Sequence, residues 1–403
     1  MKTDIALPEQ WLGMPTAIWA LAASVFAIGT TEVVMIGLLS SIAEDLSTSI
    51  ASTGWLVTSY AVGVAVGGPL VAALTNRMHR KKLLFAIMLL FVAGNGLAAL
   101  ATTFGLLLFC RVVSGVAHGV FVGIGANVAS GMVSREKRAT AISIVFTGLT
   151  VAMVTGVPLG TYIGQRVGWR FTFGSIAIVG LFCLVANQRW LPTYIKRGRA
   201  IEFTDQLRVL RHKSMMLAFA LTALSFTALF GTFTYLSPLL EMQAGFTEDQ
   251  ITLILLLYGV AVALGNLMGG KLANYQPARV IANLLALLVV TFCLMFLLLP
   301  YKIPALAVVA GMGFLGFAIV PGIQLYVIEL SEKYLPGTED VASVLNISAF
   351  NVGIAAGSIG GGILISTSPG IASITMMSAL FSAVAFGVAV MSRKQENKFT
   401  KII

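Results

Sequence analysis

The stretch Phe26-Ala-Ile-Gly-Thr-Thr-Glu32-Val-Val-Met-Ile-Gly37-Leu-Leu39 lies inside the first long apolar segment of the sequence, residues 14–39. About 20 apolar residues at 1.5 Å each cross the hydrocarbon core of a bilayer, so this segment predicts a transmembrane helix. A carboxylate inside such a helix loses its water at high cost, and intramembrane acids therefore face a polar interior and commonly serve function. Glu32 is accordingly the first candidate functional residue, and the alternative is a buried acid paired only for structure.

The composition indicates a polytopic membrane protein. Of 403 residues, 58% are hydrophobic and 10% are charged, whereas soluble proteins carry about 25% charged residues. The first apolar segment is too long for a signal peptide and is expected to direct insertion itself. Three cysteines lie in apolar segments without C-x-x-C spacing, so neither a disulfide framework nor a zinc site is expected; they are Cys110, Cys183 and Cys293.

Twelve apolar segments succeed one another along the chain. Their approximate bounds are 14–39, 52–74, 83–102, 104–132, 139–163, 171–190, 214–240, 250–272, 279–300, 303–330, 340–366 and 370–392. The long basic loop between the sixth and seventh contains a potential amphipathic helix at 205–211. We therefore expect an all-α integral membrane protein with twelve transmembrane helices in two pseudo-symmetric six-helix bundles. These bundles would comprise residues 1–190 and 214–403, joined by a cytoplasmic linker at 191–213.

The basic residues predict the orientation. With the N-terminus inside, 22 of the 26 Lys and Arg residues fall in inner segments. Cytoplasmic loops of membrane proteins are enriched in Lys and Arg, so both termini are expected in the cytoplasm of a bacterium, with the spans in its inner membrane. The same rule accounts for the net charge of +10 without any nucleic-acid partner.

An internal repeat supports two equivalent halves. Tyr60-Ala-Val-Gly-Val-Ala-Val-Gly67 resembles Tyr258-Gly-Val-Ala-Val-Ala-Leu-Gly265 at a fixed offset. Six spans in each half give both halves the same topology, an arrangement in which two bundles rock about a central site. Glycines recurring every four residues in spans 5 and 11 would let helices approach closely, although plain packing explains each one equally well.

Two further polar residues share the membrane with Glu32. Arg111 lies about seven residues into span 4 from the outer side, and Glu32 lies about seven residues from the outer end of span 1. Both are thus about 10 Å below the outer edge, where an acid and a base are expected to pair or to communicate through water. His118 follows on the same helix face and changes charge near physiological pH; hydrogen-bonded packing is its alternative role.

The second half contributes aromatic and amide side chains instead. An apolar wall with a few polar groups suits an organic substrate, although aromatic stripes in membranes also serve packing. The candidate substrate-binding residues from both halves are Tyr60, Asn127, Phe226, Phe230, Phe233, Phe317, Gln324, Asn346 and Asn351.

The sequence carries no Walker-type phosphate loop, no H-E-x-x-H and no G-x-S-x-G. An enzyme, a resident metal and a cofactor are therefore not expected. The expected partners are protons, a small-molecule substrate and the lipid bilayer, with the protein acting as a monomer.

Taken together, four segments resemble those of the major facilitator superfamily, and within it the twelve-span drug:proton antiporters, especially bacterial sugar-efflux, arabinose-efflux-like and purine-efflux permeases. The resemblance covers essentially the whole chain. The segments are Gly29-Thr-Thr-Glu32 with Gly37-Leu-Leu, Arg111-Val-Val-Ser-Gly115, Gly156-Val-Pro158-Leu-Gly160 and Gly168-Trp-Arg170-Phe. This resemblance implies a cavity lined by spans 1, 4, 7 and 10.

The resemblance also implies a gate after span 2, where Ala72-Ala-Leu-Thr-Asn76-Arg77-Met-His-Arg80-Lys matches the family's G-x-L-A-D-R-x-G-R-K. Asn76 stands where the family has an acid, so a charge relay at this gate is doubtful. A second gating segment comprises Gly156, Pro158 and Gly160, in which the usual Gly-Pro is interrupted by a valine.

The expected function is proton-coupled efflux of a small organic molecule, such as a drug, sugar or nucleoside-like compound, with Glu32 carrying the proton and no catalytic residue. A proton symporter or a uniporter importing a solute is the alternative within the same fold. An enzyme acting on lipid-linked substrates would need an acidic metal cluster at a membrane edge, and a sensor would need a soluble signalling domain.

Overall fold

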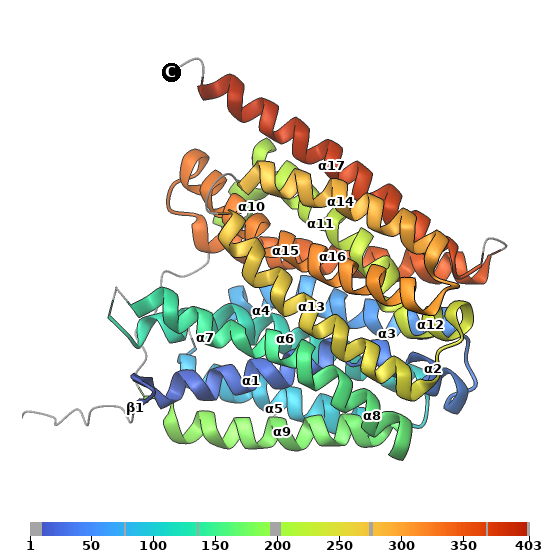
Figure 1. The fold of residues 1–403 in the computed structure, drawn as a ribbon. Coiled ribbons are helices and arrows are strands. Elements are labelled where there is room, and N and C mark those ends of the chain that lie inside the picture. Colours follow the sequence, from blue (N-terminus) through green and yellow to red (C-terminus); the bar gives the residue numbers. More distant parts are fainter. Residues whose placement is uncertain are drawn as a thin grey trace, which may run out of the picture.

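A computed structural model describes residues 10–75, 78–134, 137–193, 203–273, 277–367 and 370–400. Within these residues, twelve helical segments are long and apolar enough to cross a membrane. The expected all-α membrane fold with twelve spans is confirmed, with span bounds shifted by a few residues. Two bundles lie side by side, the first half of the chain below and the second half above (Figure 1).

The first half begins with a two-stranded hairpin and contains spans 1 to 6. Its elements are β1 (Gln10–Trp11), β2 (Met14–Pro15), α1 (Thr16–Val33), α2 (Met35–Asp45), α3 (Ile50–Val62), η1 (Gly63–Gly67), α4 (Gly68–Leu74), α5 (Arg80–Ala99), α6 (Phe104–Gly131), α7 (Arg138–Val151), η3 (Ala152–Gly156), α8 (Val157–Val167) and α9 (Trp169–Trp190). The β1–β2 ladder is antiparallel, with Gln10 opposite Pro15.

The second half contains spans 7 to 12, preceded by one short helix. Its elements are α10 (Phe203–Arg211), α11 (Lys213–Thr234), α12 (Leu236–Ala244), α13 (Glu248–Ala273), α14 (Pro277–Leu298), α15 (Lys302–Tyr334), α16 (Glu339–Ser366) and α17 (Ser373–Thr400). The helix α10 occupies the range in which the sequence predicts an amphipathic segment.

Spans 1 and 7 differ from their expected continuous helices, because each is interrupted near its end. The first breaks at Val34 between α1 and α2, and the seventh breaks at Tyr235 between α11 and α12. Pro238 explains the second break, since its ring would collide with the carbonyl of Thr234 in a continuous helix. The first half has no proline at the corresponding place, so the sequence indicates only the second break.

Spans 2 and 5 each contain one turn of π-helix followed directly by a proline. Pro69 lies in the first turn of α4 after η1, and Pro158 lies in the first turn of α8 after η3. A proline cannot donate the i→i−4 hydrogen bond and clashes with the carbonyl four residues earlier, and a wider π turn relieves both problems. The two irregular turns therefore accommodate the two prolines.

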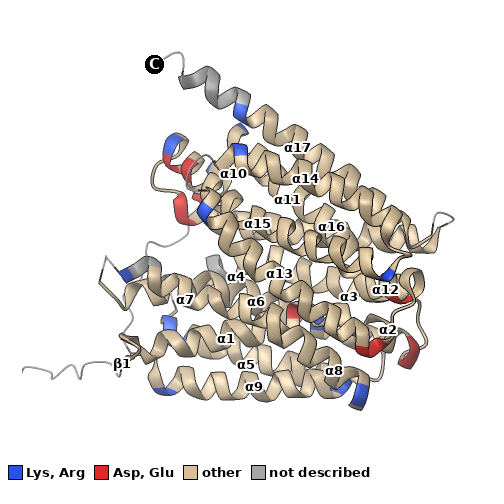
Figure 2. Ribbon diagram, viewed as in Figure 1, with Lys and Arg blue, Asp and Glu red and all other residues tan. Residues whose placement is uncertain are grey.

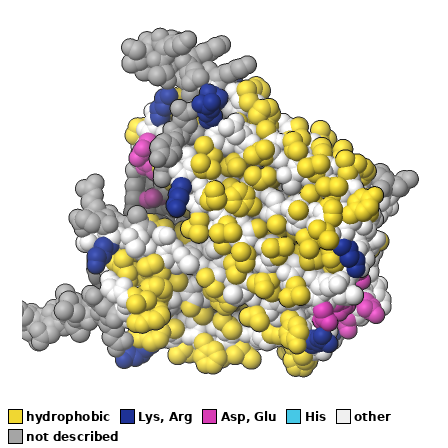
Figure 3. All heavy atoms as spheres, viewed as in Figure 1, with side chains coloured by type: hydrophobic (Ala, Val, Ile, Leu, Met, Phe, Trp, Pro, Cys, Tyr) yellow, Lys and Arg dark blue, Asp and Glu magenta, His cyan; other side chains and the backbone are white. Residues whose placement is uncertain are grey.

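Charged residues gather at the two ends of the bundle, and the middle contains few of them (Figure 2). On the face shown in Figure 3, many hydrophobic side chains lie between these ends, as expected of a surface that faces lipid. We call the end at which α9 finishes and α10 lies the linker end, and the opposite end, where α2 and α12 lie, the distal end.

Candidate functional site

Glu32 lies near the end of α1 and faces α6. Its carboxylate oxygen Oε2 is 3.8 Å from Nδ1 of His118, and its side chain keeps 18% of its surface exposed. The same Nδ1 lies 3.0 Å from the hydroxyl of Tyr60 on α3. Three spans therefore bring an acid, an imidazole and a phenol together, and these are groups that can hold and pass a proton.

Arg111 is 1% exposed and lies beside this group on α6. Its guanidinium donates to the backbone carbonyls of Thr31 at 2.6 Å, Glu32 at 3.4 Å and Leu56 at 3.0 Å. The expected proximity of Arg111 and Glu32 is present, but among the described atoms the arginine contacts the backbone of Glu32 and not its carboxylate. The guanidinium also lies 4.2 Å from the centre of the Tyr60 ring, within the range of a cation–π contact.

A buried amide that the sequence analysis did not single out supports this arrangement. Asn95 of α5 is 1% exposed; it accepts a hydrogen bond from the hydroxyl of Thr31 and donates to the carbonyl of Phe91. Thr31 in turn presents its carbonyl to Arg111. Asn95 thus fixes the last turn of α1, and an asparagine in the middle of an apolar span was the signal that could have identified it.

The second half presents an aromatic column formed by Phe226, Phe230 and Phe233 of α11, Tyr258 of α13 and Phe350 of α16. Successive ring centres lie 4.3 to 5.8 Å apart. The aromatic column belongs to an apolar cluster that also includes Ile28 and Met153 of the first half. The predicted phenylalanines on α11 are therefore neighbours, and Tyr258 and Phe350 extend them.

Two of the predicted amides, Gln324 and Asn346, bond each other. Asn346 Nδ2 donates to Gln324 Oε1 at 2.7 Å, and the amide of Gln324 donates to Ser343 at 2.6 Å. Thr222 completes the chain by donating to Asn346 Oδ1 at 2.7 Å. Such a linked set holds its amide groups in fixed orientations, because each member is a partner of the next.

Asn351 and Phe317 share no hydrogen bond with that network in the described part of the chain. Asn351 donates to the carbonyl of Ile347 on its own helix, and its buried Oδ1 has no hydrogen-bond partner in the structure. Phe317 is half-buried on α15. The side chain of Asn127 lies outside the described part of the chain.

The predicted gating segment of span 5 packs on the helix that carries Glu32. Gly156 ends η3, and a Cβ there would collide with the side chain of Thr30 in α1. Pro158 and Gly160 follow in α8, with Gly160 against Val34. The irregular turn in span 5 is thus in direct contact with the last turn of α1. Of the other predicted gate, Arg80 begins α5, whereas Asn76 and Arg77 lie outside the described residues.

The two halves meet tightly toward the distal end. The hydroxyl of Ser358 on α16 donates to the carbonyl of Gly54 on α3 at 2.8 Å, and the hydroxyl of Tyr235 donates to the carbonyl of Ser358 at 2.8 Å. Deeper in the bundle, Gly259 of α13 lies directly against the backbone of Met153 in η3. The most extensive contacts between the halves join α16 to α3 and α13 to η3 and α8, and α12 also contacts α2. The distal end is therefore closed.

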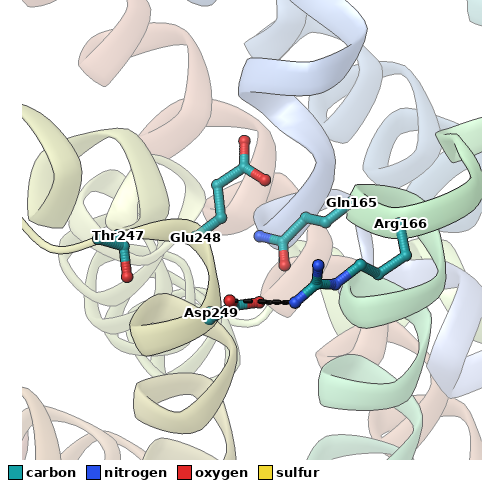
Figure 4. A pocket seen from close by; sticks show the side chains of 5 residues that line it. All are labelled: Gln165, Arg166, Thr247, Glu248 and Asp249. Carbon is teal, nitrogen blue, oxygen red and sulfur yellow. Dashed lines mark hydrogen bonds and ion pairs between the residues drawn. The ribbon is translucent and has the colours of Figure 1, made fainter.

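An ion pair joins the halves at the distal rim. Arg166 Nη2 at the end of α8 donates to Asp249 Oδ1 of α13 at 2.8 Å, with 55% and 66% of the two side chains exposed. The pair lies in a hollow of about 200 Å³ that Gln165, Thr247 and Glu248 also line (Figure 4). Gln165 accepts a hydrogen bond from Thr252 across the same junction. We call these contacts the distal latch.

Within the described part of the chain, no three His, Cys, Asp or Glu side chains group closely enough to hold a metal ion. The arrangement therefore offers a proton-holding group in the first half and an aromatic and amide surface in the second.

Residues 21–338 match the model of the Major Facilitator Superfamily. The chain is 47% identical to "Uncharacterized MFS-type transporter YtbD" of Bacillus subtilis, with 86% of this chain and 88% of the relative covered. It is 35% identical to "Inner membrane transport protein YdhP" of Escherichia coli K12, with coverage of 94% and 96%. It is also 30% identical to "Putative transporter AraJ" of the same organism, with coverage of 92% and 93%.

Solved structures share the fold at low sequence identity. A bacterial homologue of the human lysosomal transporter Spinster, in an inward-facing and occupied conformation, superposes with a TM-score of 0.74 at 14% identity, covering 94% of this chain and 96% of that one. The human organic anion transporter MFSD10 gives a TM-score of 0.68 at 16% identity, covering 93% and 98%.

Proposed function

Because this chain belongs to the Major Facilitator Superfamily, we propose that it is a secondary active transporter that exports a small organic molecule in exchange for protons. The observation that supports this proposal is the contact between Glu32 and His118, 3.8 Å apart with the Glu32 side chain 18% exposed. A coupling group must be reachable from a water-filled cavity and must alternate between charged and neutral forms. The partial exposure of the Glu32 side chain is consistent with the first condition.

The exchange would proceed by rocking of the two halves. With the distal end closed, Glu32 would release its proton toward the linker end, and substrate would bind between the polar group of the first half and the aromatic column of the second. Opening of the distal latch would then expose both to the other side. The twelve-span fold built from two repeats favours such alternating access.

We propose that the linker end faces the cytoplasm and that the membrane is the bacterial inner membrane. The support is the concentration of Lys and Arg in the segments of that end, together with the inner-membrane name of the Escherichia coli relative. The distal end, with the distal latch, would then face the periplasm.

The proposal is tested in two steps. A thermal-shift screen of sugars, nucleosides, amino acids and antibiotics on the purified protein identifies a ligand, because a ligand that binds only the folded state stabilises it. Everted vesicles then carry wild type, Glu32→Gln or Glu44→Gln, the last being an exposed acid at the distal end. With an imposed pH difference, wild type and Glu44→Gln should concentrate the ligand, and Glu32→Gln should bind it without concentrating it. Uphill accumulation by Glu32→Gln would show that another group carries the proton.

A further inference from the structure

The short helix α10 presents three different faces. At 3.6 residues per turn, Phe203, Leu207 and Leu210 align on one side, while Arg208 and Arg211 align about a quarter-turn away. Gln206 and Val209 point to a third side and are buried, at 6% and 0% exposed. We call the first set the apolar stripe and the second the basic stripe; Asp205 lies between the basic stripe and the buried side.

The buried side fixes the helix on the second half of the protein. It packs against α11 and α16, and Val209 belongs to the same apolar cluster as Met215 and Val341. The helix therefore has a defined orientation, and its other two faces point away from the protein.

The apolar stripe is exposed in the described part of the chain. Phe203 is 64% exposed, Leu207 36% and Leu210 40%. In water, three such side chains side by side on a nine-residue helix would be a costly surface. That cost would be removed if lipid, and not water, surrounded the three side chains.

The position of the helix provides that environment. Only His212 separates the end of α10 from the start of α11, so the two ends are within about 7 Å along the chain. α11 is span 7, and Met216 in its first turn is 45% exposed. The apolar stripe thus lies beside the first turn of a membrane-spanning helix, at the level where lipid headgroups are expected.

We propose that α10 is an interfacial anchor whose apolar stripe inserts among the phospholipids of the leaflet at the linker end and whose basic stripe binds their phosphate groups. Helices with Phe and Leu on one face and Arg on another lie in the headgroup–acyl boundary. Arg208 and Arg211 are exposed and would be positioned beside the lipid phosphates, with a preference for anionic lipids. The anchor would fix the second half to the membrane surface whatever solute the protein moves.

Site-specific fluorescence tests the insertion. Single cysteines replace Leu207 on the apolar stripe or Arg208 on the basic stripe, in a background in which the half-buried Cys293 is serine. Cys110 and Cys183 are buried. Each protein is labelled with an environment-sensitive dye and reconstituted in vesicles of phosphatidylcholine, with or without phosphatidylglycerol. Lipids bearing a spin label in the acyl chain should quench the dye at 207 at least threefold more than at 208, and iodide should show the opposite preference.

Two results would overturn the anchor. Equal iodide quenching at 207 and 208 would place the apolar stripe in water. Protection of 207 from both quenchers would mean that protein covers it, either a partner or a second copy of this chain.

The basic stripe is tested by native mass spectrometry of the bound lipids. The excess of phosphatidylglycerol over phosphatidylcholine should fall at least twofold in Arg208→Gln/Arg211→Gln, and it should persist in Arg393→Gln, an exposed arginine near the end of α17. An unchanged excess in the double variant would contradict phosphate binding by the basic stripe.

Discussion

The carboxylate of Glu32 and the imidazole of His118 face each other, with Oε2 3.8 Å from Nδ1. The same nitrogen lies 3.0 Å from the hydroxyl of Tyr60. A single ring nitrogen either donates one proton or accepts one, so it cannot serve both neighbours in the same way. When Nδ1 carries a proton it can be given to Glu32, and when it is bare it can accept from Tyr60. His118 therefore lies between the other two groups and can exchange a proton with either Glu32 or Tyr60.

The Tyr60 hydroxyl is predicted to stabilise the folded protein through this group of three side chains. Tyr60→Phe removes a buried hydroxyl that lies 3.0 Å from Nδ1 of His118 and 3.4 Å from the carbonyl oxygen of Ile28, and it should lower the free energy of unfolding by about 1 kcal/mol. Tyr60→Leu also removes the ring beneath Arg111 and should cost about 1–2 kcal/mol more. Thermal unfolding in detergent measures both.

The Tyr60 hydroxyl is also predicted to affect proton-driven exchange through His118. Tyr60→Phe should displace the pH midpoint of proton-driven exchange, and it should have no further effect in a His118→Gln background, because residues in contact are not additive. Additive effects of the two substitutions would show that Tyr60 does not act on the proton through His118.

Arg111 is predicted to be irreplaceable by lysine. Its guanidinium reaches three backbone carbonyls on two other spans, and an ammonium on a lysine stem cannot reproduce that fork. Arg111→Lys should lower the free energy of unfolding by about 2–4 kcal/mol, because buried acceptors lose a charged donor. Arg170→Lys is the matched control: Arg170 bonds Ala101 and Asp45 with 35% of its side chain exposed. Equal losses in the two variants would show that the buried position of Arg111 is not decisive.

The depth of Glu32 and Arg111 in the membrane could be predicted from the sequence, whereas the groups toward which their side chains point could not. Counting residues from span ends placed Glu32 and Arg111 at one level, and the structure puts them side by side. The count could not show that the guanidinium would bond the carbonyls of Thr31 and Glu32, because residue spacing does not predict which groups of a neighbouring helix a side chain reaches. It also could not pair Glu32 with His118, which lies two turns further along α6.

Contacts between distant spans were the other part that the sequence could not supply. Gln324 and Asn346 were chosen as separate polar residues, yet they bond each other, because α15 and α16 pack together. Asn95 was overlooked because it has no charge and no companion in the sequence. The helix in the linker was visible through its periodicity, whereas its exposed apolar stripe depended on which face packs on the protein.

Gly259 is predicted to control the approach of the two halves. A Cβ at this position would lie 2.8 Å from Val154 Cα, a backbone atom that cannot turn aside. Gly259→Ala should therefore push α13 away from η3 and raise the population with an open distal end. Gly96→Ala is the control, since a Cβ there meets nothing within 4 Å and should stabilise α5 by about 0.5–1 kcal/mol. Cysteine accessibility at the distal end, measured from that side, reports the difference. The same accessibility in Gly259→Ala and wild type would contradict this role.

The distal latch is predicted to bias the same equilibrium weakly. Arg166 and Asp249 are both more than half exposed, and exposed ion pairs contribute about 0.2–1 kcal/mol, so losing one should change the closed-to-open ratio by about 1.5- to 5-fold. Reversing one charge, in Arg166→Asp or Asp249→Arg, places like charges on opposite halves and should open the distal end. Reversing both should restore closure, because the pair is then rebuilt in the opposite sense. Spin labels at Glu44 and Met242, exposed positions on α2 and α12, measure the separation directly. The effect of each single reversal should shrink in high salt, which screens exposed charges. If the double reversal stays as open as either single one, then shape, and not charge, holds the distal latch closed.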